Sequence, residues 1–284
     1  KIREHFSKNK VELCSIVNAK SGLCPEDCKF CAQSSRHDTG VEQYPLIESK
    51  KILKAALRAR KNGANCFGIV ASGRATRSRK EIMGICGALE DIKKSCPGLK
   101  TSVSLGILDK ESLSELKRSG LDRFQHNLET SREYFARICT THTYQERLDA
   151  VIRAKEIGLK LCSGGIFGLG EKRAHRLDLA FTLRGLEVDS VPLNFLHPIK
   201  GTALEKARPM SVNEILRTIA IYRIVLPRGN IKVCGGRAVN LRAMQCMIFF
   251  AGANGMMIGN YLTQAGEDTK KDLAMIRDLG LRAA

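Results

Sequence analysis

Short apolar runs alternate with amphipathic segments along the 284 residues of the chain. A short apolar run that is bounded by turn residues is typical of a buried strand. We expect strands at residues 12–19, 66–71, 100–105, 123–127, 160–165, 190–195, 231–234 and 255–258.

Between these runs, apolar residues recur at the spacing of one helix face, as Leu148, Val151 and Ile152 do. Asp109 and Ser211 stand where two helices begin, because their side chains can cap free backbone amides. We expect helices near residues 49–62, 78–95, 109–119, 144–157, 171–184, 211–226 and 238–250. Alternating strands and helices predict an α/β fold, namely a (β/α)8 barrel of the TIM type, with an open α/β sheet as the alternative.

No linker or low-complexity segment divides the chain, so we expect a single barrel domain over residues 1–284. Residues 1–10 resemble the end of a helix that begins upstream, and residues 267–281 resemble a terminal helix. Every apolar run is shorter than the roughly 18–20 residues that span a bilayer, so we expect no membrane partner.

The eleven cysteines are scattered along the chain and odd in number. Free thiols of this kind serve as metal ligands or small core residues in a reducing compartment, which predicts a cytoplasmic protein. The net charge is +18, but the basic residues form no tract, aromatic residues make up 5% of the chain, and Trp is absent. Phosphate contacts and base stacking need such features, so we expect no nucleic-acid partner; an RNA-modifying enzyme would instead show salt-sensitive RNA binding.

Three cysteines, Cys24, Cys28 and Cys31, follow the first expected strand at C-x3-C-x2-C spacing. Three thiolates can hold three corners of an iron–sulfur cubane and leave one iron open for S-adenosylmethionine. Zinc is the main alternative, but the nearest downstream histidine is His37 and no second C-x2-C pair exists.

Other polar residues also fall at or just beyond the carboxyl ends of expected strands, where barrels of this type carry their active sites. They include Asn127, Glu129, Asn194 and Arg237. Single residues of this kind are often helix caps or turn residues, but a shared position at one rim indicates a site.

Cys14, Cys162 and Cys234 lie inside the first, fifth and seventh expected strands. A single strand cysteine is most often a small buried hydrophobic residue. Three that face one barrel interior could instead bind a second cluster, with Arg237 contributing positive charge. The pattern leaves both interpretations open.

Six segments resemble the biotin synthase family, and they occur in the family's order over nearly the whole chain. The segments are residues 21–35, 126–131, 143–148, 162–171, 191–196 and 251–254. The resemblance implies a radical S-adenosylmethionine barrel that inserts sulfur into dethiobiotin to form biotin. It implies that Cys24, Cys28 and Cys31 hold a [4Fe-4S] cluster, that this cluster generates a 5′-deoxyadenosyl radical, and that an auxiliary iron–sulfur cluster donates the sulfur.

The resemblance also assigns individual contacts. Arg147 matches the residue that pairs with the methionyl carboxylate, and Glu129 matches the acidic residue at the ribose, which is more often Asp. Asn127 is expected at the cofactor and, together with Asn194, at the ureido ring of dethiobiotin, whereas Thr263 is expected at the substrate carboxylate. An electron donor such as flavodoxin or ferredoxin and a homodimer are further implications.

The chain departs from the family at the auxiliary cluster, whose usual [2Fe-2S] ligands are three cysteines and an arginine. Cys162 and Arg237 match this pattern, but the other two cysteine positions hold Gly68 and Ser102. We therefore do not expect a standard [2Fe-2S] cluster.

Three explanations compete for this departure. The cluster could be rebuilt on Cys14, Cys162 and Cys234, which is the explanation we favour. The chain could be a paralogue that acts on another small molecule, or Cys66 could serve as a ligand one layer deeper. A non-enzymatic iron–sulfur or zinc protein would not cleave S-adenosylmethionine.

Overall fold

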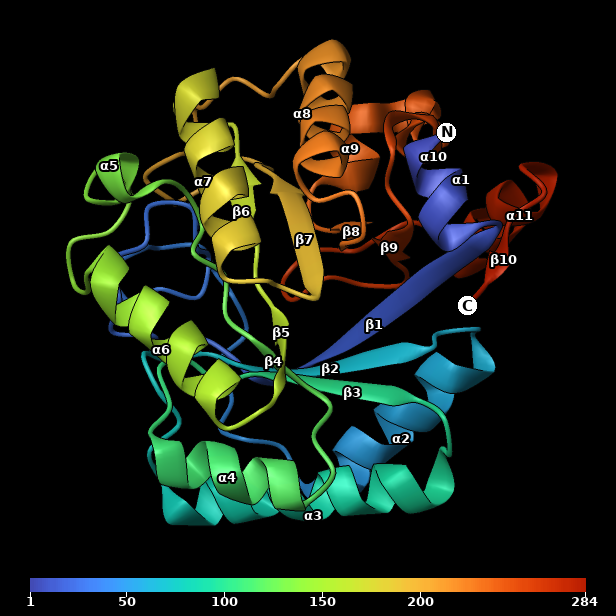
Figure 1. Ribbon diagram of the computed structural model, residues 1–284. Coiled ribbons are helices and arrows are strands. Elements are labelled where there is room, and N and C mark those ends of the chain that lie inside the picture. The colour runs from blue at the N-terminus through green and yellow to red at the C-terminus, as the bar shows by residue number, and fades with distance from the viewer.

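A closed barrel of parallel strands forms the centre of the computed structural model, which describes residues 1–284 (Figure 1). The strands are β1 (Lys10–Lys20), β2 (Cys66–Ala71), β3 (Lys100–Ser104), β4 (Arg123–Gln125), β5 (Lys160–Cys162), β6 (Gly165–Phe167), β7 (Ser190–Phe195), β8 (Asn230–Val233), β9 (Gly255–Met257) and β10 (Arg282–Ala283). Strand β1 pairs with β2 on one side and with β9 on the other, which closes the barrel. The predicted TIM-type barrel is confirmed, and the open sheet is excluded.

The fifth expected strand is divided into β5 and β6, and both pieces pair with β7. Gly164 and Gly165 lie at the division. A Cβ on Gly164 would lie 2.0 Å from the carbonyl oxygen of Pro192, and one on Gly165 would lie 2.4 Å from that of Glu129. Gly164 therefore lets the backbone of β7 approach at Pro192, and Gly165 lets the backbone of Glu129 approach the barrel closely.

Helices surround the barrel (Figure 1). They are α1 (Ile2–Ser7), α2 (Ser49–Lys61), α3 (Arg79–Ser95), α4 (Lys110–Arg118), α5 (Arg132–Phe135), α6 (Tyr144–Glu156), α7 (Arg173–Gly185), α8 (Val212–Val225), α9 (Arg237–Leu241), α10 (Met247–Ala251) and α11 (Thr269–Asp278). The helix expected at 238–250 is broken into α9, a short 3-10 turn (Arg242–Met244) and α10. The expected terminal helix is present as α11, and the short α5 was not expected.

Capping residues begin the helices where the sequence predicts them. The Asp109 side chain accepts the backbone amide of Ser112 at 2.8 Å, and the Ser211 hydroxyl accepts that of Glu214 at 3.3 Å. Thr143 and Glu146 form a reciprocal capping box at the start of α6. No helix of the fold has the length and apolar character to cross a membrane.

Candidate active site

The loop that follows β1 carries Cys24, Cys28 and Cys31 at the carboxyl end of the barrel. Its backbone folds onto itself: the Cys24 amide donates to the Gln33 carbonyl at 3.0 Å, and the Ser35 amide donates to the Cys24 carbonyl at 2.8 Å. The three cysteines thus lie on the rim where the sequence predicts the site.

Asp27 fastens this loop to the segment between α5 and α6. Its carboxylate accepts the amides of Thr140 and Thr141 at 2.8 and 3.2 Å, and the Lys29 amide donates to the Ile138 carbonyl at 2.9 Å. Burial alone would raise the pKa of Asp27, but these hydrogen bonds hold it well below its usual value. Asp27 is therefore a charged anchor for the cysteine loop.

Cys24, Cys28 and Cys31 line one cavity of about 180 Å³, together with Glu129 and Arg147. Burial raises the pKa of Cys24, and it raises that of Cys31 to about 11. Buried thiols of this kind ionise only beside a compensating cation. Soft thiolate ligands that converge on one cavity fit an iron–sulfur cluster.

Arg147 on α6 links two other predicted cofactor contacts across this cavity. Its Nε donates to the Asn127 carbonyl at 2.6 Å, and its Nη2 lies 3.2 Å from Oε1 of Glu129. Burial raises the pKa of Glu129, and the nearby Arg147 only partly offsets the rise. Glu129 also has a φ of 68°, an uncommon conformation for a residue other than glycine, and such strain concentrates at functional sites.

Two buried polar atoms on this wall lack hydrogen-bond partners, Oδ1 of Asn127 and Nε2 of His126. Unpaired buried polar atoms are rare in folded proteins because each costs free energy. Both residues line the cavity with the cysteines, so a polar ligand there would satisfy them. The wall therefore fits S-adenosylmethionine, which carries charged and hydroxyl groups.

A second cavity of about 350 Å³ adjoins the first and is lined by Asn194 and Thr263. Cys31, Asn127 and Glu129 line both cavities. The predicted cofactor and substrate residues thus line two adjoining cavities that share part of their walls.

Asn194 is held in place by two backbone contacts. Its Nδ2 donates to the Gly165 carbonyl at 3.2 Å, and its Oδ1 accepts the Gly235 amide at 2.8 Å. The side chain is therefore fixed at the cavity wall by its neighbours on β6 and after β8.

Buried thiols also face one another deeper in the barrel, around the ammonium group of Lys232. Lys232 Nζ lies 3.3 Å from Sγ of Cys14. Burial raises the pKa of Cys162, and it raises that of Cys234 to about 12; the charge of Lys232 partly offsets both rises. The three predicted auxiliary thiols therefore lie near one buried cation.

Cys66 belongs to the same group. It lies in register with Cys14 on the neighbouring strand, and ligand atoms of Glu12, Cys14 and Cys66 all lie within 4.8 Å of one another. Arg123 closes the group below, with Nη1 and Nη2 at 2.6 and 2.8 Å from the two carboxylate oxygens of Glu12. Four thiols with two cations and one carboxylate thus fill the barrel interior, and this soft donor set fits iron.

Arg237 has two partners outside the group of thiols. Its Nη2 lies 2.7 Å from Oδ2 of Asp272, and its Nη1 contacts Gln245. The guanidinium is therefore engaged by α11 and the segment before α10, whereas the cation beside the Cys14 thiol is Lys232. The charge of Arg237 also acts on the Cys234 thiol and helps to offset the rise in its pKa, so the assignment of Arg237 to the auxiliary cluster stays a prediction.

Sequence reasoning missed the charged residues inside the barrel. Glu12 stands two residues before Cys14 on β1, and Lys232 stands two residues before Cys234, which directly follows β8, so each pair is spaced to share one face. This spacing of two residues between a charged residue and a cysteine is the sequence signal that could have indicated charged groups beside the thiols.

Two family models match the chain. The Radical SAM superfamily model matches residues 20–183, and the Biotin and Thiamin Synthesis associated domain matches residues 192–282. The solved structure of methylornithine synthase superposes with a TM-score of 0.85 at 19% identity, covering 100% of this chain and 86% of that one. The FeFe-hydrogenase maturase HydG from Carboxydothermus hydrogenoformans superposes with a TM-score of 0.83 at 17% identity, covering 99% and 69%. These likenesses concern the fold.

Curated relatives are far more similar in sequence. Biotin synthase from Geotalea daltonii is 51% identical over 284 residues, which are 100% of this chain and 86% of the relative. Biotin synthase from Citrifermentans bemidjiense is 52% identical over 282 residues, which are 99% and 85%. Full-length identity at this level, together with both family models, shows that the chain belongs to the biotin synthase family of radical SAM enzymes.

Proposed function

We propose that this chain forms biotin from dethiobiotin by radical S-adenosylmethionine-dependent sulfur insertion. The observation that carries the proposal is the pair of adjoining cavities at the barrel mouth, where Cys31, Asn127 and Glu129 line both. A radical made at one end must reach its substrate directly, and adjoining cavities would hold cofactor and substrate side by side.

Cys24, Cys28 and Cys31 would hold the [4Fe-4S] cluster. When bound, the cluster and S-adenosylmethionine supply the radical that removes hydrogen from substrate carbon. Arg147 would bind the methionyl carboxylate and Glu129 the ribose hydroxyls, and Asn127 would direct its unpaired Oδ1 at the ligands. Arg147 keeps Glu129 oriented through the contact at 3.2 Å.

Asn127 and Asn194 would hydrogen-bond the ureido ring of dethiobiotin, because a neutral amide can both donate and accept. Thr263, which lines the larger of the two cavities, would bind the substrate carboxylate. The contacts of Asn194 with Gly165 and Gly235 support its role, since a fixed amide pays less entropy on binding.

Cys14, Cys162 and Cys234 would hold the auxiliary cluster, which supplies the sulfur. Their convergence on Lys232 supports this assignment. The absence of thiols at Gly68 and Ser102 argues against a standard [2Fe-2S] cluster. Cys66 is a fourth thiol within reach of Cys14.

Anaerobic reconstitution with iron and sulfide tests these assignments. Wild-type protein given S-adenosylmethionine, a reductant and dethiobiotin should yield 5′-deoxyadenosine and biotin. Formation of 5′-deoxyadenosine without biotin would favour the paralogue that acts on another small molecule, and absence of both would refute the enzyme assignment.

A double variant, Cys14→Ser/Cys234→Ser, tests the auxiliary site by iron and sulfide counts. It should lose the auxiliary iron and biotin formation while it still cleaves S-adenosylmethionine. Cys246→Ser is the control, because this half-buried thiol lies outside the barrel interior and should change neither count. An unchanged iron content in the double variant would refute the hypothesis that Cys14, Cys162 and Cys234 hold the auxiliary cluster.

Three implications of family membership stand as predictions beside this proposal. They are an electron donor such as flavodoxin or ferredoxin, a homodimer, and a cytoplasmic location. Reduction assays with each donor, sedimentation and cell fractionation test them in turn.

A further inference from the structure

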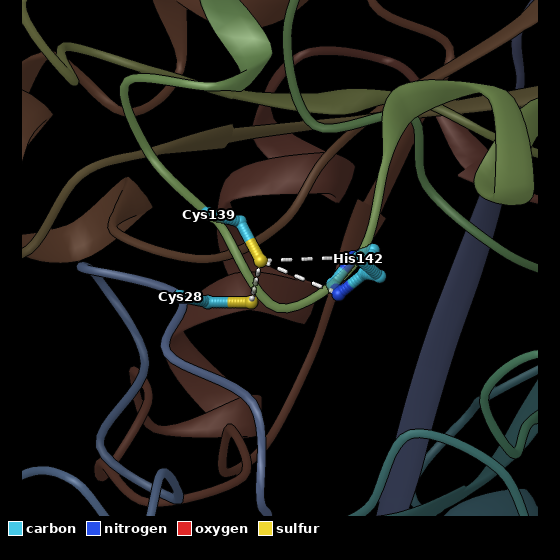
Figure 2. Close-up of side chains that lie close together, drawn as sticks. All are labelled: Cys28, Cys139 and His142. Carbon is cyan, nitrogen blue, oxygen red and sulfur yellow. Dashed lines mark hydrogen bonds between the residues drawn. The ribbon is translucent and has the colours of Figure 1, made fainter.

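A fourth thiol adjoins the loop of the three cluster cysteines. Cys139 lies in the segment between α5 and α6, and its Sγ is 3.7 Å from Sγ of Cys28 (Figure 2). Cys139 is buried. His142 follows three residues later and brings Nδ1 to 3.3 Å from the same sulfur.

The oxygen acceptors around Cys139 are already engaged. Sγ of Cys139 can donate to Oδ1 of Asp27 at 3.2 Å, and this oxygen also accepts the amides of Thr140 and Thr141. The Thr141 hydroxyl lies 3.5 Å from Sγ and accepts the Asp27 amide. Because an S–H group is a weak donor and this oxygen also accepts stronger donors, Asp27 holds the thiol only weakly.

His142 does not accept the Cys139 proton. Arg147 Nη1 lies 3.0 Å from Nε2 of His142, and a guanidinium can only donate. The neutral ring must then carry its proton on Nδ1, which contacts the Glu26 carboxylate. The sulfur of Cys28 is then the further neighbour that can accept from Cys139, beside the Asp27 carboxylate and the Thr141 hydroxyl.

We propose that Cys139 donates an S–H···S hydrogen bond to the Cys28 sulfur in the cluster-loaded enzyme and thereby raises the reduction potential of the cluster. The inference rests on the proposed role of Cys28 as an iron ligand. A Cys28 thiolate bound to iron has no proton and can only accept. Reduction adds negative charge that spreads onto the sulfurs, and a hydrogen bond to a ligand sulfur stabilises that charge.

Cys139 is thus a tuning residue that acts through Cys28, and it touches neither cofactor nor substrate in this role. Asp27 and His142 fix the position of the Cys139 thiol, and Arg147 fixes the tautomer of His142. One residue of the S-adenosylmethionine wall is therefore connected to the electronic environment of the cluster.

The test is a potentiometric titration of reconstituted protein, followed by electron paramagnetic resonance. The signal that changes on addition of S-adenosylmethionine identifies the cluster of interest. In Cys139→Ala the reduction equilibrium constant should fall about threefold to tenfold, where tenfold equals 59 mV for one electron. Cys139→Ser keeps a donor and should restore most of the potential.

Cys96→Ala is the matched control, since Cys96 is a fully buried thiol at the end of α3, away from the cavity. Its potential should equal that of wild type. Iron and sulfide counts accompany each titration, so a lost cluster is not mistaken for a shifted potential. Resonance Raman spectra of wild type in H2O and D2O should also show a shift in the Fe–S(Cys) stretch, and this measurement needs no variant.

An unchanged potential in Cys139→Ala would overturn the proposal, and so would a wild-type Fe–S stretch that deuteration leaves unmoved. A rise in potential would also overturn it, because that result would mean a neighbouring thiolate. If wild type took up no cluster through Cys28, the proposed function would fail instead. The two failures are thus distinguishable.

Discussion

Lys232 on β8 places its ammonium nitrogen 3.3 Å from the sulfur of Cys14 on β1, inside the closed barrel. The same nitrogen lies 3.3 Å from Oε1 of Glu12. Although burial alone would lower the pKa of Lys232, the thiols and Glu12 around it raise this pKa well above its usual value. The barrel interior therefore provides a fixed positive charge next to the proposed sulfur donor.

Lys232→Met should weaken auxiliary-cluster binding by about tenfold or more, the range seen when groups that support metal ligands are removed. The chain should still fold, because Glu12 keeps its paired contact with Arg123. Iron and sulfide counts at limiting iron measure the effect, and Lys232→Arg is the control that keeps the charge. Equal iron in Lys232→Met and wild type would contradict the prediction.

Much of the barrel could be predicted from the sequence because its strands are continuous apolar runs. Parallel strands that are buried on both faces are apolar at nearly every position, and the helices between them are marked by capping residues and helical periodicity. The division between β5 and β6 was missed because Gly164 and Gly165 act through a long-range approach to Pro192 and Glu129. Closure likewise depends on the pairing of β1 with β9, which no local pattern reports.

The site was only partly predictable for a similar reason. Cys24, Cys28 and Cys31 lie within one short loop, so their spacing alone indicates a cluster. Cys139 and Lys232 reach their partners across more than a hundred residues. In the sequence alone, Lys232 could equally lie at the solvent-exposed end of a short strand. Only the strand register of the barrel shows that its side chain is buried.

The ion pair between Arg237 and Asp272 should stabilise the folded chain. Asp272→Asn removes the negative partner of a fully buried guanidinium, which typically costs about 3–5 kcal/mol. Chemical denaturation measures the loss, and Asp278→Asn, an exposed position on the same helix, should change stability little. Iron per folded chain should be unchanged in Asp272→Asn. A selective loss of auxiliary iron would instead support the assignment of Arg237 to the auxiliary cluster.

Gly68 should not accept a larger residue without cost. An added Cβ would lie 3.0 Å from Cγ2 of Ile16 and 3.1 Å from Oγ of Ser102. Gly68→Ala should therefore destabilise the fold by about 1–3 kcal/mol, as overpacking does. In a double-mutant cycle, Ile16→Ala should relieve part of this cost. Additive effects of the two changes would show that the crowding is absent.

His126 should make stability fall in mild acid. Burial lowers its pKa well below 6.5, with smaller contributions from Arg147 and His142, which face it, and its ring stacks on Phe124. Below pH 6.5 the His126 imidazole is therefore protonated in the unfolded chain but stays neutral in the folded chain. The free energy of unfolding should drop as pH falls from 6.5, and this group contributes at most about 2 kcal/mol of the loss at pH 5.

His126→Gln removes that titration, so its stability should change less than that of wild type between pH 6.5 and 5. Urea denaturation at each pH measures both profiles. His197→Gln is the control, because this half-buried side chain lies on the rim of the larger cavity. Parallel profiles for wild type and His126→Gln would contradict the prediction.

Arg147 should bind S-adenosylmethionine through its shape as well as its charge. Its three nitrogens contact the Asn127 carbonyl at 2.6 Å, the Glu129 carboxylate at 3.2 Å and Nε2 of His142 at 3.0 Å. A lysine keeps the charge but cannot span three partners in one plane. Arg147→Lys should therefore raise the Kd for S-adenosylmethionine about tenfold or more, since a hydrogen bond to a charged group contributes about 1.5–3 kcal/mol.

Equilibrium dialysis with reconstituted protein measures that affinity without turnover. Iron and sulfide counts should match those of wild type, because Arg147 is not an iron ligand. Arg132→Lys is the matched control, since Arg132 lies outside the cavity and contacts Gln145 on the surface. An unchanged Kd in Arg147→Lys would mean that the carboxylate of the cofactor is bound elsewhere on the wall.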